Sequence, residues 1–145
     1  MKAEIHYSQM PRNYLLCLNG GCPRANTCLR QLVVRSIPAD KPHWLIISPH
    51  YLAALQERAC PFYRSAAKAR FAKGCVRLLE NLPYKQMQAV ISQLISCFSQ
   101  RTYYRIRKGE RLLSPAEQQQ VLNILEKCGT DHPQEFDAYV EQYDW

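Results

Sequence analysis

Four of the seven cysteines in this 145-residue chain have a spacing that could bind a metal ion. Cys17, Cys22 and Cys28 share one segment that contains two glycines, and Cys60 follows later in a Cys-Pro step. The resulting pattern is C-x4-C-x5-C-x31-C. Four thiolates can hold zinc tetrahedrally, and Cys-Pro steps are also compatible with an iron–sulfur cluster. The sequence therefore predicts a zinc site at these four cysteines, with an iron–sulfur cluster as the alternative.

Two features leave other interpretations of the cysteines open. The C-x2-C knuckle typical of zinc sites is missing, so the four thiols could instead be small buried hydrophobic groups. His43 or His50 could also replace one cysteine as a ligand. The remaining three cysteines, Cys75, Cys97 and Cys128, lie on or beside expected helices and are predicted to be core residues.

A short basic segment, residues 99–111, could recognise an anionic partner. Helical spacing places Tyr103 and Ile106 on its inner side. The side chains predicted to point outward or to flank that outer face are Arg101, Tyr104, Arg105, Arg107, Lys108 and Arg111. Arginine can bond guanine through two hydrogen bonds, while lysine and tyrosine can hold phosphates. The segment predicts a nucleic-acid-binding helix, although a helix whose cations only face water, or one that docks on a protein, has the same pattern.

Charge is distributed unevenly along the chain. The formal net charge is +7, but residues 130–145 contain five acids and no Lys or Arg, which leaves +12 on residues 1–129. Arg70, Lys73 and Arg77 would share one face of a helix and could meet a phosphate backbone. A basic body with an acidic tail suggests either an anionic partner or a tail that folds over the basic face.

The sequence gives little support for a membrane protein, a secreted protein or an enzyme of a common class. The longest apolar runs are far shorter than the roughly 20 residues of a membrane span, and the first residues do not form a secretory signal. We therefore expect a cytoplasmic protein, in which an odd number of cysteines is not a disulfide framework. C-x-x-C motifs, Gly-rich phosphate loops, nucleophile elbows and metalloprotease helices are all missing. An iron–sulfur or thiol enzyme is accordingly the least supported function.

Mainly helical elements are expected to position these residues. Apolar periodicity predicts a helix over residues 84–95, and Ser114 with Glu117 forms a capping box that should start a helix ending at Gly129. A further helix is expected over residues 65–81, and residues 136–143 are expected to add a helical turn. Residues 44–47 are rich enough in β-formers to predict a buried strand.

The order of helix, four-residue turn, short basic helix and capped helix resembles the helix-turn-helix unit of small bacterial repressors. The resemblance covers about residues 84–129 and would place the basic helix in the major groove of DNA. The sequence thus predicts a mainly α protein, a helical bundle in two parts. Residues 1–62 would form a loop-rich, cysteine-containing front, and residues 63–145 a helical part with the helix-turn-helix-like unit and the acidic tail.

Several segments together resemble a group of short bacterial proteins known only as a domain of unknown function. These segments are residues 17–32, 60–62, 101–118 and 136–141. The resemblance spans most of the chain and implies a self-contained bacterial protein, but no activity. From the residues themselves we expect a nucleic-acid-binding protein, more specifically a DNA-binding regulator, with a structural metal site. A protein-interaction adaptor is the second expectation.

Overall fold

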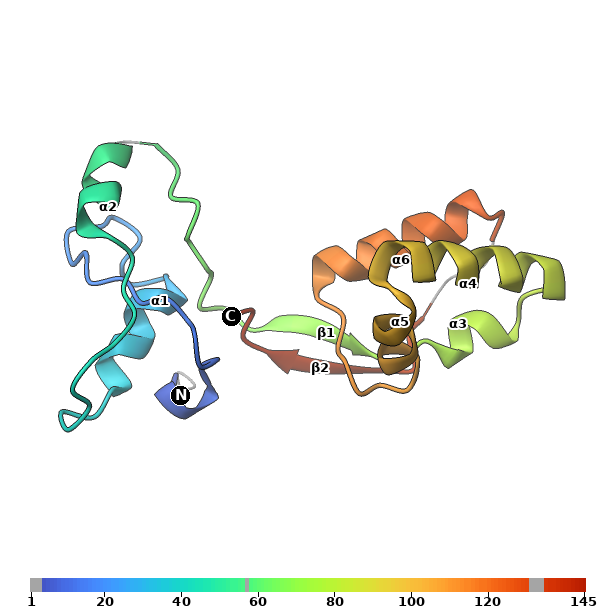
Figure 1. Cartoon of the computed structure of the whole chain (residues 1–145), viewed down its shortest axis with the longest axis horizontal. Coiled ribbons are helices and arrows are strands. Elements are labelled where there is room, and N and C mark those ends of the chain that lie inside the picture. Colours follow the sequence, from blue (N-terminus) through green and yellow to red (C-terminus); the bar gives the residue numbers. More distant parts are fainter. Residues whose placement is uncertain (1–3, 57, 131–134) are drawn as a thin grey trace. The chain divides into compact units, whose positions relative to one another are not determined.

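The described part of the chain divides into two units. The computed structural model describes residues 4–56, 58–130 and 135–145. Unit 1 consists of the described residues of Met1–Lys68 together with Tyr143–Trp145, and unit 2 is formed by those of Ala69–Gln142. In sequence, unit 2 is therefore inserted between two parts of unit 1. Figure 1 labels the α-helices and strands of both units.

Unit 1 is rich in loops and contains only short helices among its described residues. They are the 3-10 helices η1 (Tyr7–Gln9) and η2 (Val33–Ser36) and the α-helices α1 (Leu29–Leu32) and α2 (Pro49–Leu55). The core of the unit lies around Tyr14, Leu16 and Val33, all buried. Six of the nine prolines lie in this unit, where long helices are disfavoured because proline cannot donate to the helical ladder.

The strand expected at residues 44–47 is wrong. This stretch makes a single isolated parallel bridge, between Leu16 and Ile46. Pro42 and Pro49 lie close to its two ends and lack the N–H groups that would extend a ladder.

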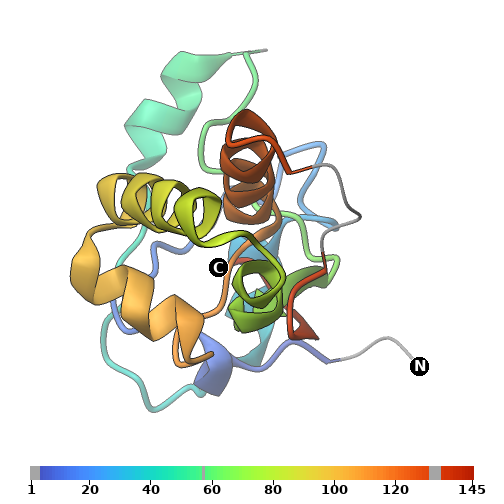
Figure 2. The same ribbon diagram turned by 90° about the vertical axis from the view of Figure 1, so that its right-hand side faces the viewer.

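Unit 2 combines four helices with a two-stranded antiparallel sheet. Its elements are β1 (Ala69–Lys73), α3 (Val76–Glu80), α4 (Tyr84–Phe98), α5 (Gln100–Arg107), α6 (Pro115–Lys127) and β2 (Ala138–Gln142). The helix α4 contacts both α5 and α6, so these three helices lie side by side (Figures 1 and 2). The buried residues of this core include Val90, Leu94, Tyr103, Ile106, Leu113, Val121 and Leu125.

Two helices expected from the sequence are replaced by strands, one of them only in part. The helix expected over residues 65–81 is replaced by β1 and the short α3, which are separated by Gly74 with a φ of 76°. The helical turn expected at residues 136–143 is instead β2, with Ala69 opposite Gln142 and Lys73 opposite Ala138. Phe71 and Ala72 of β1 are buried, and a positive φ ends the strand where glycine has no Cβ to clash.

The expected helices with strong local signals are confirmed. The helix predicted over residues 84–95 is α4, and the capping box of Ser114 and Glu117 starts α6. The helix-turn-helix resemblance is not supported. Its four-residue turn is missing, because α4 continues through Phe98 and only Ser99, with a φ of 74°, separates it from α5.

Candidate nucleic-acid interface and thiol pocket

The helix α5 is anchored by its inner side. Tyr103 and Ile106 are only 1% and 3% exposed, which confirms the predicted inner pair. Burial raises the pKa of Tyr103, and the nearby Arg107 guanidinium offsets part of that rise. The ring of Tyr103 meets that of Tyr104 edge-on, with centroids 5.1 Å apart. These contacts fix which side of α5 is turned away from the core.

The opposite side of α5 is cationic and exposed. We call this surface the α5 face; it comprises Arg101, Tyr104, Arg105 and Lys108, all of which are exposed, as is the neighbouring Arg107. The only ion pair between described residues joins Arg111 and Glu117. The cations of the α5 face therefore have no carboxylate partner in the described part of the chain.

Arg111 differs from the other predicted binding residues. Its Nη2 lies 2.7 Å from Oε1 of Glu117, and the other carboxylate oxygen of Glu117 accepts a hydrogen bond from the Ser114 amide. Burial alone would raise the pKa of Glu117, but the Ser114 amide and the Arg111 guanidinium together hold it below its ordinary value of 4.5. Arg111 thus completes the start of α6 and is half-buried.

An exposed lysine outside α5 lies beside the residue Gly109 that follows this helix. The aliphatic part of the Lys73 side chain passes Gly109, which follows α5 with a φ of 78°; a Cβ there would lie 3.1 Å from Lys73 Cγ. The shared helical face expected for Arg70, Lys73 and Arg77 is wrong, because the first two lie on β1 and the third on α3. Side chains alternate along a strand, so Arg70 and Lys73 project from opposite faces. The Arg70 guanidinium instead stacks 3.7 Å above the Tyr139 ring.

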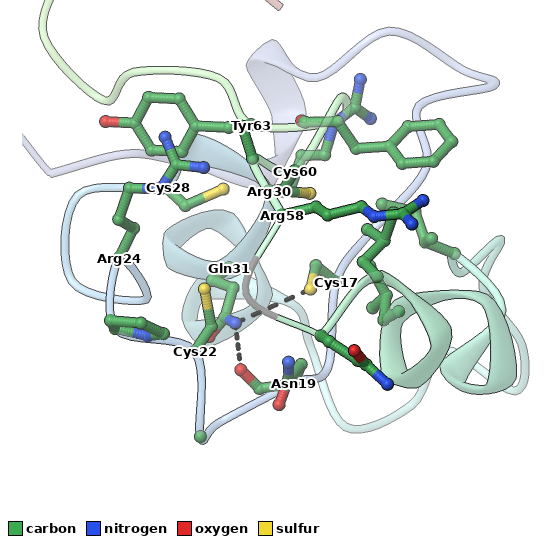
Figure 3. A pocket seen from close by; sticks show the side chains of 18 residues that line it. Cys17, Asn19, Cys22, Arg24, Cys28, Arg30, Gln31, Arg58, Cys60 and Tyr63 are labelled. Carbon is green, nitrogen blue, oxygen red and sulfur yellow. Dashed lines mark hydrogen bonds between the residues drawn. The ribbon is translucent and has the colours of Figure 1, made fainter.

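In unit 1, the four cysteines predicted to bind a metal all line one pocket (Figure 3). The pocket has a volume of about 610 Å³. Cys17, Cys22 and Cys60 are half-buried and Cys28 is buried, and all four are free thiols. Among the described His, Cys, Asp and Glu side chains, however, no group of three is placed to hold a metal ion. The structure brings the four thiols to one pocket without closing a coordination sphere, so the metal site remains a prediction.

The other three cysteines lie in unit 2 and have three different environments. Cys75 is buried, as predicted, and Cys128 is half-buried against the core. Cys97 is exposed, so its predicted core position is wrong. Helical spacing puts Cys97 on the same side of α4 as the buried Val90 and Leu94, but in the last turn of the helix. His43 and His50, considered as replacement ligands, do not line the pocket of unit 1.

Arginines are the charged residues that line the pocket. Arg24, Arg30 and Arg58 all contribute to its wall, and no carboxylate is among its described lining residues. Arg30 is held by two hydrogen bonds of 2.7 Å, from Nε to the Phe62 carbonyl and from Nη1 to the Leu15 carbonyl. Its guanidinium also lies 4.2 Å from the centroid of the Tyr14 ring.

Sequence reasoning missed these arginines, although a signal was present. Each is two residues from a cysteine, in Cys22-Pro23-Arg24, Cys28-Leu29-Arg30 and Arg58-Ala59-Cys60. Sequence reasoning also missed Gln31, whose Nε2 donates to the Asn19 carbonyl and lies 3.7 Å from Cys17 Sγ. In Figure 3 this amide points between the two acceptors.

The match to a known protein family includes both units of the chain. The sequence matches the family of unknown function DUF6078 over residues 1–145. The chain belongs to that family. Neither a curated protein nor a solved structure matches this DUF6078 chain. This match confirms the resemblance to a family of unknown function that the sequence suggested. The family has no assigned activity, so the evidence for function lies in the α5 face and the pocket of unit 1. In the described part of the DUF6078 chain, the helices are all too short or too polar to cross a bilayer.

Proposed function

We propose that the chain binds nucleic acid through the α5 face. The observation that carries the proposal is the exposure of Arg101, Arg105 and Lys108 on one side of a helix without a carboxylate partner among the described residues. Cations in this state release counterions when they meet phosphates, and this release supplies most of the sequence-independent affinity for nucleic acid.

The dimensions of the α5 face suit a nucleic-acid backbone. Arg101 and Lys108 are seven residues apart, which corresponds to about 10 Å along a helix. The major groove of DNA is about 12 Å wide, so the cations could reach phosphates or base edges from within it. Tyr104 lies between them and is 44% exposed, which leaves its ring free to stack on a base or its hydroxyl to bond a phosphate.

The environment of α5 supports a role as a displayed helix. Tyr103 and Ile106 hold its inner side in the core of unit 2, so the outer side chains are presented on a fixed backbone. The exposed Lys73 side chain passes Gly109, two residues beyond the end of α5. Base readout by Arg105 would make the chain a DNA-binding regulator, whereas contacts to phosphates alone would make it a general nucleic-acid binder.

A charge-matched pair of variants tests the proposal. The test variant carries Arg101→Ala, Arg105→Ala and Lys108→Ala, and the control carries Lys41→Ala, Lys85→Ala and Lys127→Ala at exposed positions off the α5 face. Both lose three charges. Fluorescence anisotropy with duplex DNA, single-stranded DNA and RNA, each measured from 50 to 200 mM salt, gives the affinities.

Each lost phosphate contact should reduce the salt slope on duplex DNA by about 0.9. The wild-type affinity should therefore fall over this salt range by about 40-fold more than that of the test variant, since three contacts are removed. The control should keep the wild-type slope. Equal losses in both variants would show that binding follows net charge and would refute the α5 face. A chain that binds none of the three probes at 50 mM salt would refute nucleic-acid binding, and the α5 face would then be a candidate for docking an acidic protein.

A further inference from the structure

We propose that the pocket of unit 1 binds a small amphipathic acid, in which a carboxylate or phosphate head is carried on an apolar chain. The volume of about 610 Å³ lies within the roughly 300–1,000 Å³ that is typical of small-molecule sites. This inference is independent of nucleic-acid binding, since the pocket is lined only by residues of unit 1 and α5 belongs to unit 2.

The charged side chains in the described wall of the pocket are all cations. Arg24, Arg30 and Arg58 line it, and no carboxylate is among its described lining residues. Arg24 precedes α1 and Arg58 follows α2, so two segments far apart in the sequence each bring a cation to the same pocket (Figure 3). Guanidinium groups bind carboxylates and phosphates through paired hydrogen bonds. The charge of the wall therefore favours a ligand with an anionic head.

Neutral groups hold two of these arginines in position. Arg30 donates hydrogen bonds of 2.7 Å to the carbonyl groups of Leu15 and Phe62. The Arg24 guanidinium lies 4.2 Å from the centroid of the Tyr63 ring. Carbonyl groups and aromatic rings orient a guanidinium but do not cancel its charge. The half-buried Arg30 therefore keeps a positive charge beside the pocket, and a bound anion would compensate it.

Aliphatic side chains give the pocket a second, apolar part. Ile47, Leu52 and Leu55 line it, the last two from α2. A neighbouring hollow of about 230 Å³ shares Ile47 and Leu52 with the pocket. The wall of this hollow includes Leu18, which is 59% exposed, and no charged side chain is among its described lining residues. Cations at the pocket and an uncharged hollow beside it match a ligand with an anionic head and an apolar chain.

The cysteines of the pocket fit this ligand as part of the wall. A thiol behaves as a small hydrophobic group with a weak hydrogen-bonding capacity, so it can contact an apolar chain. Cys17, Cys22 and Cys60 are half-buried at the pocket. A bound acid would cover these thiols, and their rate of chemical modification therefore reports whether the pocket is occupied.

A matched series of ligands tests the proposal on the full-length chain. The probes are decanoate, decyl phosphate, the uncharged decanol and inorganic phosphate, each kept below the concentration at which it aggregates and measured by isothermal titration calorimetry. At least one of the two acids should bind about tenfold or more tightly than decanol and than inorganic phosphate, because hydrogen bonds to charged groups and burial of the chain both contribute. The acid that binds more tightly identifies the preferred head group.

Three results of this series would overturn the proposal. Decanol that binds as tightly as both acids would exclude recognition of the head by the arginines. Inorganic phosphate that binds as tightly as both acids would exclude recognition of the chain. Failure of both acids to bind would exclude the site itself.

Paired arginine variants locate the site. Arg24→Gln combined with Arg58→Gln should weaken binding of the preferred acid about tenfold or more. The matched control combines Arg12→Gln with Arg35→Gln, which removes two charges from exposed positions of unit 1 that do not line the pocket. This control should bind the acid as the wild type does. An equal loss in both variants would show that binding follows net charge and would refute the pocket as the site.

Cysteine modification gives a readout on the wild-type chain and keeps the test valid if a variant does not fold. A saturating concentration of the preferred acid should slow the alkylation of at least one of Cys17, Cys22 and Cys60 by iodoacetamide. The exposed Cys97 of unit 2 is the internal control and should react at the same rate with and without the acid. Unchanged rates at all three pocket thiols, or equal slowing at Cys97, would refute binding in the pocket.

Discussion

Removal of the Asp137 carboxylate should lower the stability of unit 2 more than the loss of a half-buried polar group usually does. Oδ1 accepts a hydrogen bond of 2.8 Å from the Arg77 amide, and Oδ2 accepts one of 3.0 Å from the Val76 amide. These amides begin α3, whose N-cap residue Cys75 makes no side-chain cap of its own. Asp137, about 60 residues later in the chain, therefore acts as the missing cap.

The magnitude follows from the two hydrogen bonds and from the helix end. Loss of a helix cap costs about 0.5–2 kcal/mol, and a carboxylate at a helix N-terminus adds about 0.3–1 kcal/mol. We expect Asp137→Ala to lower the free energy of unfolding by about 2 kcal/mol, which for a unit of this size is a fall in Tm of roughly 10 °C. Asp137→Asn should lose about half as much, because one amide oxygen can still accept a hydrogen bond.

The control removes the same charge from the neighbouring strand. Glu141 is exposed on β2 and caps no helix, so Glu141→Ala should change stability by less than about 0.5 kcal/mol. Chemical denaturation gives the free energies, and amide hydrogen exchange at Val76 and Arg77 gives the local readout, since both protons should exchange faster in Asp137→Ala. Equal stability of Asp137→Ala and Glu141→Ala, with unchanged exchange at α3, would refute the capping role.

Two further predictions concern titratable groups in unit 2. The lowered pKa of Glu117 means that its contribution to stability is present above the ordinary value of 4.5 and is lost as the pH falls through the folded-state value. Glu117→Gln should therefore be less stable than the wild type at pH 7, and the stabilities of the two should converge as the pH falls from 4.5 through the folded-state pKa of Glu117. A difference that stays constant over this range would contradict the Arg111–Glu117 pair as the source of the stability. Burial, and to a smaller extent the Asp137 carboxylate, raise the pKa of Cys75 to about 11. At pH 8 only about one molecule in a thousand therefore carries Cys75 as a thiolate. Mass spectrometry after iodoacetamide treatment of native protein should find Cys97 alkylated and Cys75 unmodified, and early modification of Cys75 would show that its site opens readily.

Local signals in the sequence were sufficient to predict the helices α4 and α6. Residues 84–98 carry apolar side chains at helical spacing, and the capping box at Ser114 satisfies the first amides of α6 within four residues of sequence. The inner pair Tyr103 and Ile106 followed from the same periodicity. In each case the residues that decide the structure are neighbours in the chain, so their pattern can be read without knowledge of the fold.

The sheet could not be predicted in the same way, because its partners are distant. Phe71 of β1 pairs with Val140 of β2, and nothing near residue 71 signals a partner 69 positions later. Read alone, residues 65–81 have good helix formers and a plausible cap. The decisive residue is Gly74, whose positive φ ends β1 and whose missing Cβ leaves room for the Asp137 carboxylate. A long-range contact thus overrides local propensity here.

The pocket of unit 1 could be predicted only in part from the sequence. Spacing alone predicted that Cys17, Cys22, Cys28 and Cys60 act together, and the structure places all four around one pocket. The charged wall was missed because each arginine was counted only toward net charge. Its position two residues from a cysteine was the available signal.

The acidic tail illustrates how placement changes the meaning of charge. As a sequence it could fold over the α5 face and mimic nucleic acid, and Asp131 lies outside the described residues. Asp137, however, accepts hydrogen bonds from the first amides of α3, and Glu141 lies opposite Arg70 in the sheet. Both acids therefore have positions that follow from the pairing of β2 with β1. Because Asp137 caps α3, and neither carboxylate pairs with Arg101, Arg105 or Lys108 among the described residues, the charge of the α5 face is available to a partner outside the chain.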